Sequence, residues 1–177
     1  MGHNTIMPMA VGRAQRLFLV RFFSLLVLFY LIVALPLGDR YLVAPFTHIL
    51  AKIGATILRE VGEPVAVNGT LMYGNRFGVD IKNGCNGIEV VIFLCAAMVA
   101  FEAPLGWRLI GIAAGALAIQ ILNMARIVSL YLLGLYRRDL FDRFHLTIWQ
   151  SIIFAAAVFI FFYWTTRVRR IDAASAR

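Results

Sequence analysis

Asn83-Gly84-Cys85-Asn86-Gly87-Ile88-Glu89 is the stretch that best indicates how this chain folds, and the apolar run 90–101 follows it directly. Glycines around a polar segment indicate a turn, and the apolar run predicts a helix. The stretch alone leaves two interpretations of Cys85 open. It is either a nucleophile held at the start of a helix or a small residue in a turn.

The composition predicts an integral membrane protein. Of 177 residues, 62% are hydrophobic and 15% are charged, whereas a soluble domain is about half apolar. The mean hydropathy is +0.83. The net charge of +8 does not indicate nucleic-acid binding, because the basic residues flank apolar runs, as they do in membrane proteins. Cys85 and Cys95 lie ten residues apart, about 15 Å along one helix, which is beyond the reach of a disulfide.

The apolar runs predict a single all-α polytopic membrane domain over residues 1–177, with four or five transmembrane helices. The expected spans are 22–37, 85–102, 107–135 and 146–166. The flanks 1–21 and 167–177 carry mostly basic charges, so we expect both ends in the cytoplasm and the chain in the inner, cytoplasmic membrane. We expect the N-terminal run to be a retained helix, because no small-residue cleavage pattern follows it, with a cleaved signal peptide as the alternative.

Two segments between these spans have different patterns. Residues 41–60 place apolar side chains at helical spacing but are interrupted by Lys52, Arg59 and Glu60. We expect this helix to lie in the membrane interface, with a fifth span as the alternative. Residues 136–144 are rich in charge and predict a polar loop or an interfacial turn.

Residues 65–82 predict a small β-hairpin or a three-stranded meander just before the cysteine turn. Apolar residues recur here with a period near two, between the turn dipeptides Asn68-Gly69 and Gly74-Asn75. Open strand edges cannot face lipid, so we expect this segment outside the bilayer, on the extracytoplasmic side. A free strand edge there offers pairing to an extended peptide.

The lengths of the two apolar arms predict that three side chains meet at one membrane face. The break at 102–106 predicts a helical hairpin, and about 20 helical residues cross about 30 Å of hydrocarbon. Cys85 lies 20 residues before Leu105, and Arg126 lies 21 residues after it. His145 stands at the start of the last span. We therefore expect Cys85, Arg126 and His145 on the same, extracytoplasmic face at similar depth.

Cys85 and Arg126 both have a functional and a structural interpretation. Cys85 precedes a helix whose N–H groups and dipole would lower the pKa of its thiol and line an oxyanion hole. Cys95, within the apolar run, is a small hydrophobe. Arg126 is costly in lipid and should face a polar interior, in a stripe with Gln120 and Asn123; the alternative is snorkelling to the headgroups.

His145 is the expected proton carrier, because its ordinary pKa of about 6.5 suits a general base or acid. Taken alone, it would be a helix cap or an interfacial residue. Trp149 either lines the site or belongs to an aromatic belt, and His48 is the rival base. Two cysteines and three scattered histidines have no ligand spacing for a metal, and no phosphate loop is present, so we expect no cofactor.

Asn83-Gly84-Cys85-Asn86-Gly87, the segment Asn123-Met124-Ala125-Arg126-Ile127-Val128-Ser129-Leu130 and His145 ahead of the final helix together resemble the exosortase/archaeosortase family of membrane-embedded cysteine transpeptidases. The chain looks like one of its small single-domain forms, such as the exosortase H type. The resemblance runs from about residue 65 to the basic tail. Many larger members have about eight spans, so the set of helices around the substrate differs here.

The resemblance implies that Cys85, Arg126 and His145 are the catalytic residues. It also implies the substrates: secreted proteins with a C-terminal sorting signal made of a short motif, a transmembrane helix and a basic tail. Cys85 would attack the scissile carbonyl, and the resulting thioester would pass to a nucleophile of a glycan or lipid. We expect Asn83, Asn86, Glu89 and Asn123 to support the site or bind substrate.

Two alternatives remain open from the residues. The chain could be a membrane protease in which water resolves the thioester. It could instead be a non-enzymatic scaffold or a small transporter subunit, in which Arg126 is a structural or ion-pathway charge. Membrane lipid is an expected partner in every case.

Overall fold

The computed structural model describes residues 7–175, and most of them are helical. Four helices form the body of the molecule: α1 (Met7–Ala34), α4 (Ile88–Ala100), α5 (Leu105–Tyr136) and α7 (Trp149–Ser175). Shorter helical elements are α2 (Pro36–Gly38), α3 (Ala44–Glu60), α6 (Arg138–Arg143) and two π-helical turns, η1 (Asp39–Val43) and η2 (Phe144–Ile148). The strands are β1 (Ala66–Asn68), β2 (Leu71–Tyr73) and β3 (Gly78–Asp80).

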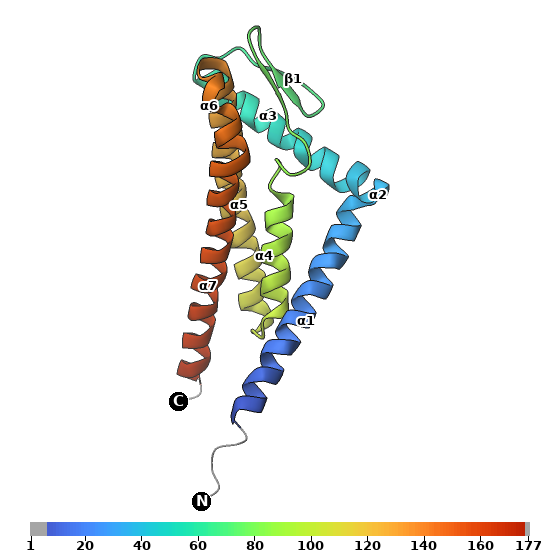
Figure 1. The fold of residues 1–177 in the computed structure, drawn as a ribbon, viewed down its shortest axis with the longest axis vertical. Coiled ribbons are helices and arrows are strands. Elements are labelled where there is room, and N and C mark those ends of the chain that lie inside the picture. Colours follow the sequence, from blue (N-terminus) through green and yellow to red (C-terminus); the bar gives the residue numbers. More distant parts are fainter. Residues whose placement is uncertain (1–6, 176–177) are drawn as a thin grey trace, which may run out of the picture.

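The predicted fold class, an all-α membrane protein with a small sheet, is confirmed. In Figure 1, α1, α4, α5 and α7 run along the length of the molecule, and the N- and C-terminal ends lie at the same end of it. Four helical segments are long and apolar enough to cross a membrane: Gly12–Ala34, Pro36–Glu60, Leu105–Tyr136 and Arg138–Arg170. At 13 residues, α4 is shorter and rises only about 20 Å.

Helix α3 runs across the end of the bundle opposite the termini, in a direction transverse to the long helices (Figure 1). The segment Pro36–Glu60 also has the lowest mean hydropathy of the four, 1.4. One stripe of α3 is buried against the sheet and α5, while Ile49, Ile53 and Ile57 form an exposed apolar stripe. The helix thus has one buried and one exposed apolar stripe and lies across a bundle end, and its placement in the interface stays a prediction.

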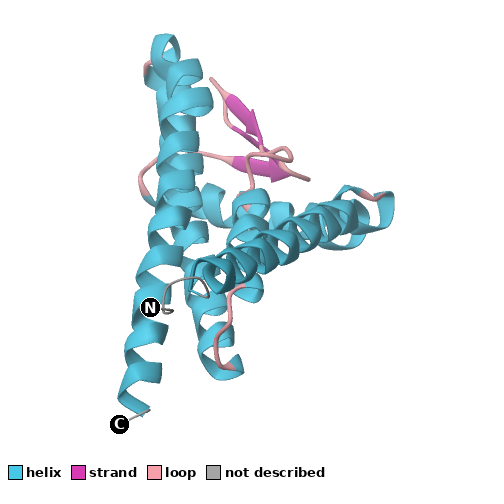
Figure 2. Ribbon diagram, turned by 60° about the horizontal axis from the view of Figure 1, so that its bottom comes forward, coloured by secondary structure: helices cyan, strands magenta, loops and turns pink. Residues whose placement is uncertain are grey.

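The region 65–82 is the three-stranded form of the predicted meander. The strand order is β1-β2-β3 and both pairs are antiparallel, with Val67 opposite Met72 and Met72 opposite Val79. Gly69 closes the first turn at φ +62°. Met72 is fully buried in a core that the sheet shares with α3 and α5. Figure 2 shows the sheet beside the helices at this end of the molecule.

A second core joins α4, α5 and α7 nearer the termini. Its fully buried members include Leu94, Met98 and Ile119. Gly115 of α5 leaves room for Leu94, because a Cβ at this glycine would come within 2.7 Å of the Leu94 Cδ2 atom. A third cluster joins α1 to α4. Helix α4 therefore packs against α1, α5 and α7, and this packing fixes the position of its first residue, Ile88, in the bundle.

Two segments differ from their predicted conformation. The helix expected over 85–102 begins at Ile88, because Gly87 adopts the left-handed conformation at φ +76°, which stops the helix there. Of the two conformations expected over 136–144, the polar loop is wrong, and the interfacial turn stays a prediction. Tyr136 ends α5, Arg137 is a break, 138–143 form α6, and Phe144 begins η2, which leads into α7. The reason is packing, since Phe141 of α6 lies 5.8 Å from Phe77 beside the sheet.

Candidate active site

Cys85 lies in the turn that joins the sheet to α4. Gly84 and Gly87 both have positive φ, +87° and +76°, which side chains rarely tolerate. The Cys85 N–H donates to the carbonyl of Lys82 at 2.9 Å. The Gly84 N–H donates to the Glu89 carboxylate at 2.7 Å, so a residue in the first turn of α4 folds back to close the loop. The cysteine is thereby held between two fixed glycine conformations.

His145 faces this cysteine from the opposite side of the site. Its Nε2 lies 3.1 Å from the Cys85 Sγ atom, which is close enough for a proton to pass between them. The histidine sits in η2, and π-helical turns of this kind occur often at functional sites. The ring of Phe141, one turn earlier, packs on the imidazole with centroids 5.5 Å apart.

Arg126 completes the group from α5. Its side chain is buried, with 4% of the residue exposed. Nη2 lies 3.9 Å from the Cys85 Sγ atom, and Nη1 donates to the Gln150 side-chain oxygen at 3.4 Å. This burial matches the predicted polar interior and not a side chain snorkelling to the headgroups. The structure thus brings Cys85, Arg126 and His145 together, as the arm lengths predicted.

The expected lowering of the Cys85 pKa is wrong for the protein without substrate. Burial raises the pKa of this thiol above its ordinary value by more than the Arg126 guanidinium lowers it, and the Glu89 carboxylate adds a smaller increase. One of the N–H groups expected to stabilise a thiolate, that of Ile88, instead donates to the Asn86 side chain at 3.1 Å. Cys85 therefore rests as a neutral thiol and needs a base to become a nucleophile.

Asn86 fixes the cysteine turn to the helices beside it. It is fully buried, and besides accepting from Ile88 it donates through Nδ2 to the Thr47 hydroxyl at 3.0 Å. Thr47 lies on α3, so one carboxamide ties the cysteine turn to both α3 and α4. Asn86 is a positioning residue in this arrangement, because it has no hydrogen bond to the thiol.

The other three predicted supporting residues occupy different places. Glu89 closes the turn, as described. Asn123 is fully buried against Gly87, where a Cβ would come within 3.1 Å of the Asn123 Cγ atom. Neither polar atom of the Asn123 side chain has a hydrogen-bond partner among the described residues. Asn83 points elsewhere, and donates to the Asp39 carboxylate at 3.2 Å on the exposed side of the turn.

Two residues of the site, Gln150 and Thr47, were not predicted from the sequence. Gln150 could have been found, because it is a polar residue in an apolar run and lies shortly after His145. Nothing in the sequence distinguishes Thr47, since hydroxyls are common on interfacial helices.

The rival base His48 contacts the Gly69 carbonyl in the sheet and not the cysteine. Trp149 is partly buried and packs against the core of α4, α5 and α7, with its indole nitrogen buried.

The part of the chain that the structure describes contains no group of three or more His, Cys, Asp or Glu side chains placed to hold a metal ion. Within the described residues, the chemistry at this place rests on a thiol, an imidazole and a guanidinium. A thiol beside a base, with a fixed cation near both, is the donor set of nucleophilic acyl transfer.

Comparison with known proteins identifies a family. A family model described as transmembrane exosortase matches residues 6–163. The matched region contains Cys85, Arg126 and His145, the sheet, and most of the helical bundle. Searches among curated proteins and among solved structures found no match.

Proposed function

This chain belongs to the transmembrane exosortase family, and on that premise we propose that it is a cysteine transpeptidase that cleaves the C-terminal sorting signal of secreted proteins and transfers them to an envelope acceptor. The observation that carries the proposal is the 3.1 Å approach of the Cys85 Sγ atom to His145 Nε2. A scaffold or transporter subunit has no need of a thiol and an imidazole in contact beside a buried arginine.

In the first step, His145 removes the thiol proton of Cys85 as the sulfur attacks the scissile carbonyl carbon. A carbon–sulfur bond forms, and the electron pair of the carbonyl double bond moves to its oxygen. The raised pKa of Cys85 makes the base necessary, because little thiolate exists near neutral pH. Among the described residues, His145 is the one side chain hydrogen-bonded to the sulfur that ordinarily titrates near neutrality.

Arg126 stabilises the oxyanion of this intermediate. Its guanidinium lies 3.9 Å from the sulfur, so an oxygen on the attacked carbon comes within reach of its N–H groups. Because the side chain is buried, water does not screen its charge, and an oriented donor in such a site is worth about 3–4 kcal/mol in the transition state.

The intermediate collapses when the carbon–nitrogen bond breaks and the leaving amine takes the proton from His145. The product is a thioester on Cys85. An amine or hydroxyl group of a glycan or lipid acceptor then gives its proton to His145 and attacks the thioester, which restores the thiol. Water in place of the acceptor would give hydrolysis.

Charge supports one placement of the site in the membrane. The end of the bundle that holds both termini is rich in arginine, and basic flanks favour the cytoplasmic side. We place that end in the cytoplasm of a cell with this chain in its inner membrane, so that Cys85 faces the extracytoplasmic side. Secreted substrates reach this side after export.

The sheet supports an extended recognition motif. Since the strand order is β1-β2-β3, the outer edge of β3 is unpaired within the sheet. Strand β3 ends at Asp80, five residues before Cys85, so a peptide paired with this edge would lead toward the thiol.

The test replaces Cys85 by Ala or Ser in cells that express a tagged substrate carrying a sorting signal. We expect both variants to accumulate unprocessed substrate, while Cys95→Ala processes it normally because Cys95 lies away from the site on α4. Processing by Cys85→Ala would overturn the proposed nucleophile. The mass of the product's new C-terminus separates transfer from hydrolysis.

A further inference from the structure

A groove of about 820 Å³ lies at the end of the bundle opposite Cys85. It opens between the N-terminal part of α1, the C-terminal part of α7 and the loop that follows α4. Aromatic and aliphatic side chains make up most of its wall, among them Leu17, Phe18, Phe101, Phe161 and Phe162. The catalytic residues take no part in it.

The length of the groove matches one leaflet of a bilayer. On α1 its lining runs from residue 14 to 21, a rise of about 10 Å, and on α7 from 161 to 169, about 12 Å. Half of a hydrocarbon core of about 30 Å is about 15 Å. The groove therefore suits the acyl chains of a lipid in one leaflet, and is too short to seat a helix that crosses the membrane.

Among the described residues, two aromatic contacts join the walls of the groove. Phe101 of the loop meets Phe161 of α7 edge-on, with ring centroids 6.1 Å apart. Phe18 of α1 stacks on Phe161 of α7 with ring centroids 6.2 Å apart. Most of the packing of α1 is instead against α4, through Phe22 and the small residues Ala96, Ala97 and Ala100. Apolar surface on both sides of the Phe18–Phe161 contact is thus left for an apolar occupant.

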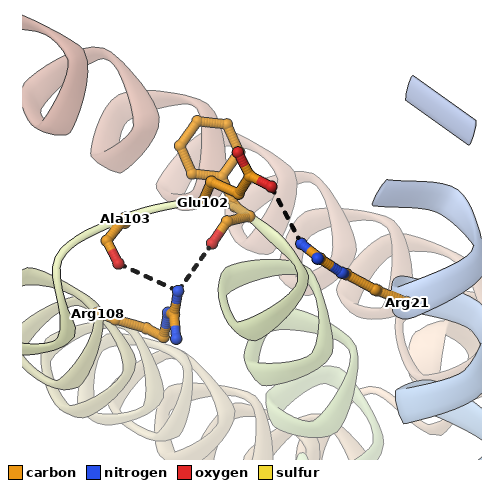
Figure 3. A network of polar contacts seen from close by, with 5 residues as sticks. Arg21, Glu102, Ala103 and Arg108 are labelled. Atoms are coloured by element: carbon orange, nitrogen blue, oxygen red, sulfur yellow. Dashed lines mark hydrogen bonds and ion pairs between the residues drawn. The ribbon is translucent and has the colours of Figure 1, made fainter. Parts of the chain in front are cut away.

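The rim of the groove is held in place by arginines. Figure 3 shows Arg21 of α1 reaching Glu102, at 3.2 Å, while Arg108 of α5 donates to the main-chain carbonyls of the same loop. Those carbonyls belong to Phe101, at 3.2 Å, and Ala103, at 3.1 Å. Arg169 of α7 lies over the Phe101 ring at 5.7 Å. A guanidinium stacked on a ring keeps the N–H groups at its edge available for an anion.

We propose that this groove binds an anionic glycerophospholipid of the cytoplasmic leaflet, with its acyl chains between α1 and α7 and its phosphate at Arg169. The charge favours a lipid over the helix of a sorting signal, because the basic tail of such a signal would stand beside Arg21 and Arg169. Further arginines at this end, Arg16 and Arg170 among them, add to the attraction for an anionic headgroup. The proposal does not depend on the proposed catalytic function.

Trp164 provides a reporter for the test. Its indole lies 5.6 Å from Phe101 and 6.3 Å from Phe161, directly behind the wall of the groove. In the full chain carrying Trp107→Phe and Trp149→Phe, Trp164 is the only tryptophan. This chain is reconstituted with phospholipids brominated on the acyl chain, either phosphatidylglycerol or phosphatidylcholine, at increasing mole fraction in a background of unlabelled phosphatidylcholine.

We expect brominated phosphatidylglycerol to quench Trp164 at a several-fold lower mole fraction than brominated phosphatidylcholine. Arg169→Gln should reduce this preference about fivefold, the effect of one basic residue near a lipid surface. Arg169→Lys, which keeps the charge, should retain most of it. Arg170→Gln is the matched control, since Arg170 is the adjacent exposed arginine and does not line the groove, and it should reduce the preference by clearly less than Arg169→Gln does.

Three results would overturn the proposal. Equal quenching by the two lipids would mean ordinary contact with surrounding lipid. An equal loss in Arg169→Gln and Arg170→Gln would mean a general attraction to the basic end. Relief of the quenching by an added peptide with an apolar helix and a basic tail would mean that the groove receives the sorting signal.

Discussion

The two ends of α4 are each met by an arginine of α5, and the two arginines have different partners. Near the end of α4, Arg108 donates to two main-chain carbonyls of the loop after α4. Before its start, Arg126 has a thiol and one carboxamide within reach, both weak or distant partners. One guanidinium is occupied by the fold and the other keeps hydrogen-bonding capacity. The same side chain is structural or reactive according to the acceptors that surround it.

The largest expected effect concerns His145, which lies beside Cys85 at the start of α4. His145→Gln removes the base while keeping a polar side chain, and it should reduce substrate processing about 10²–10⁴-fold. The matched control is His48→Gln, because His48 contacts the sheet turn at Gly69 and should leave processing nearly unchanged. Processing is measured as the rate of conversion of a tagged substrate. If His145→Gln and His48→Gln process substrate at the same rate, His145 is not the base, and the start of α4 is not the reactive end.

The next effect tests the two arginines directly. Arg126→Gln should lower processing about 10²–10³-fold, because it removes the charge that faces the oxyanion. The variant should still insert and purify as the parent does. A loss smaller than tenfold would mean that Arg126 is not the oxyanion donor.

Arg108→Gln is the counterpart at the other end. It removes hydrogen bonds to the carbonyls of Phe101 and Ala103 and should lower the free energy of unfolding by about 1–3 kcal/mol, with processing per folded molecule retained. Thermal melting in detergent and the processing rate together separate the two outcomes. A variant that melts normally and processes poorly would reverse the roles assigned to the two arginines.

A smaller effect is expected from the glycines beside the two ends. Gly87→Ala places a Cβ at φ +76° and within 3.1 Å of Asn123 and Gln120. Left-handed backbone alone costs about 1–2 kcal/mol for an alanine. Gly106→Ala is the control, because its Cβ would have no neighbour within 4 Å and alanine favours the helix. Melting temperatures should fall for the first variant and hold or rise for the second.

The smallest effect is a shift of a titration midpoint. A thiol-reactive probe reacts with the thiolate, so in a Cys95→Ala chain the labelling of Cys85 should increase with pH and reach half its plateau above the pH found for free cysteine, since burial raises the pKa of Cys85. Arg126→Gln should move this midpoint higher, because Arg126 lowers the Cys85 pKa. Glu89→Gln should move it lower. A parent midpoint below that of free cysteine would contradict the neutral thiol.

The meeting of Cys85 with Arg126 could be predicted from the sequence, although α4 is shorter than expected. Counting residues on each arm gives equal heights only if both arms are helical, and the residues before Ile88 are not. Long helical side chains point back toward the N-terminus of their helix, so Arg126 reaches down α5 toward the turn. The residue count therefore predicted the contact correctly, because the arginine side chain is long enough to span the difference in height between Arg126 and Cys85.

Other properties could not be read from the pattern of residues. The raised pKa of Cys85 depends on its burial, which the chain creates by laying α3 and η2 beside the turn. Residues 136–144 look like a loop because of their charges, yet Phe141 packs on Phe77 and keeps them helical. Thr47 supports the turn through Asn86 from a helix far away in the sequence. These are tertiary contacts, for which local periodicity contains no information.

The short length of α4 has a consequence for water. If the loop after α4 lies at one boundary of a hydrocarbon core of about 30 Å, a rise of about 20 Å would place the cysteine turn about 10 Å inside the other boundary. A thioester formed in such a recess is shielded from the aqueous phase. Under the proposed function, we expect such a thioester to last longer against hydrolysis and to be resolved by an acceptor that approaches along the lipid.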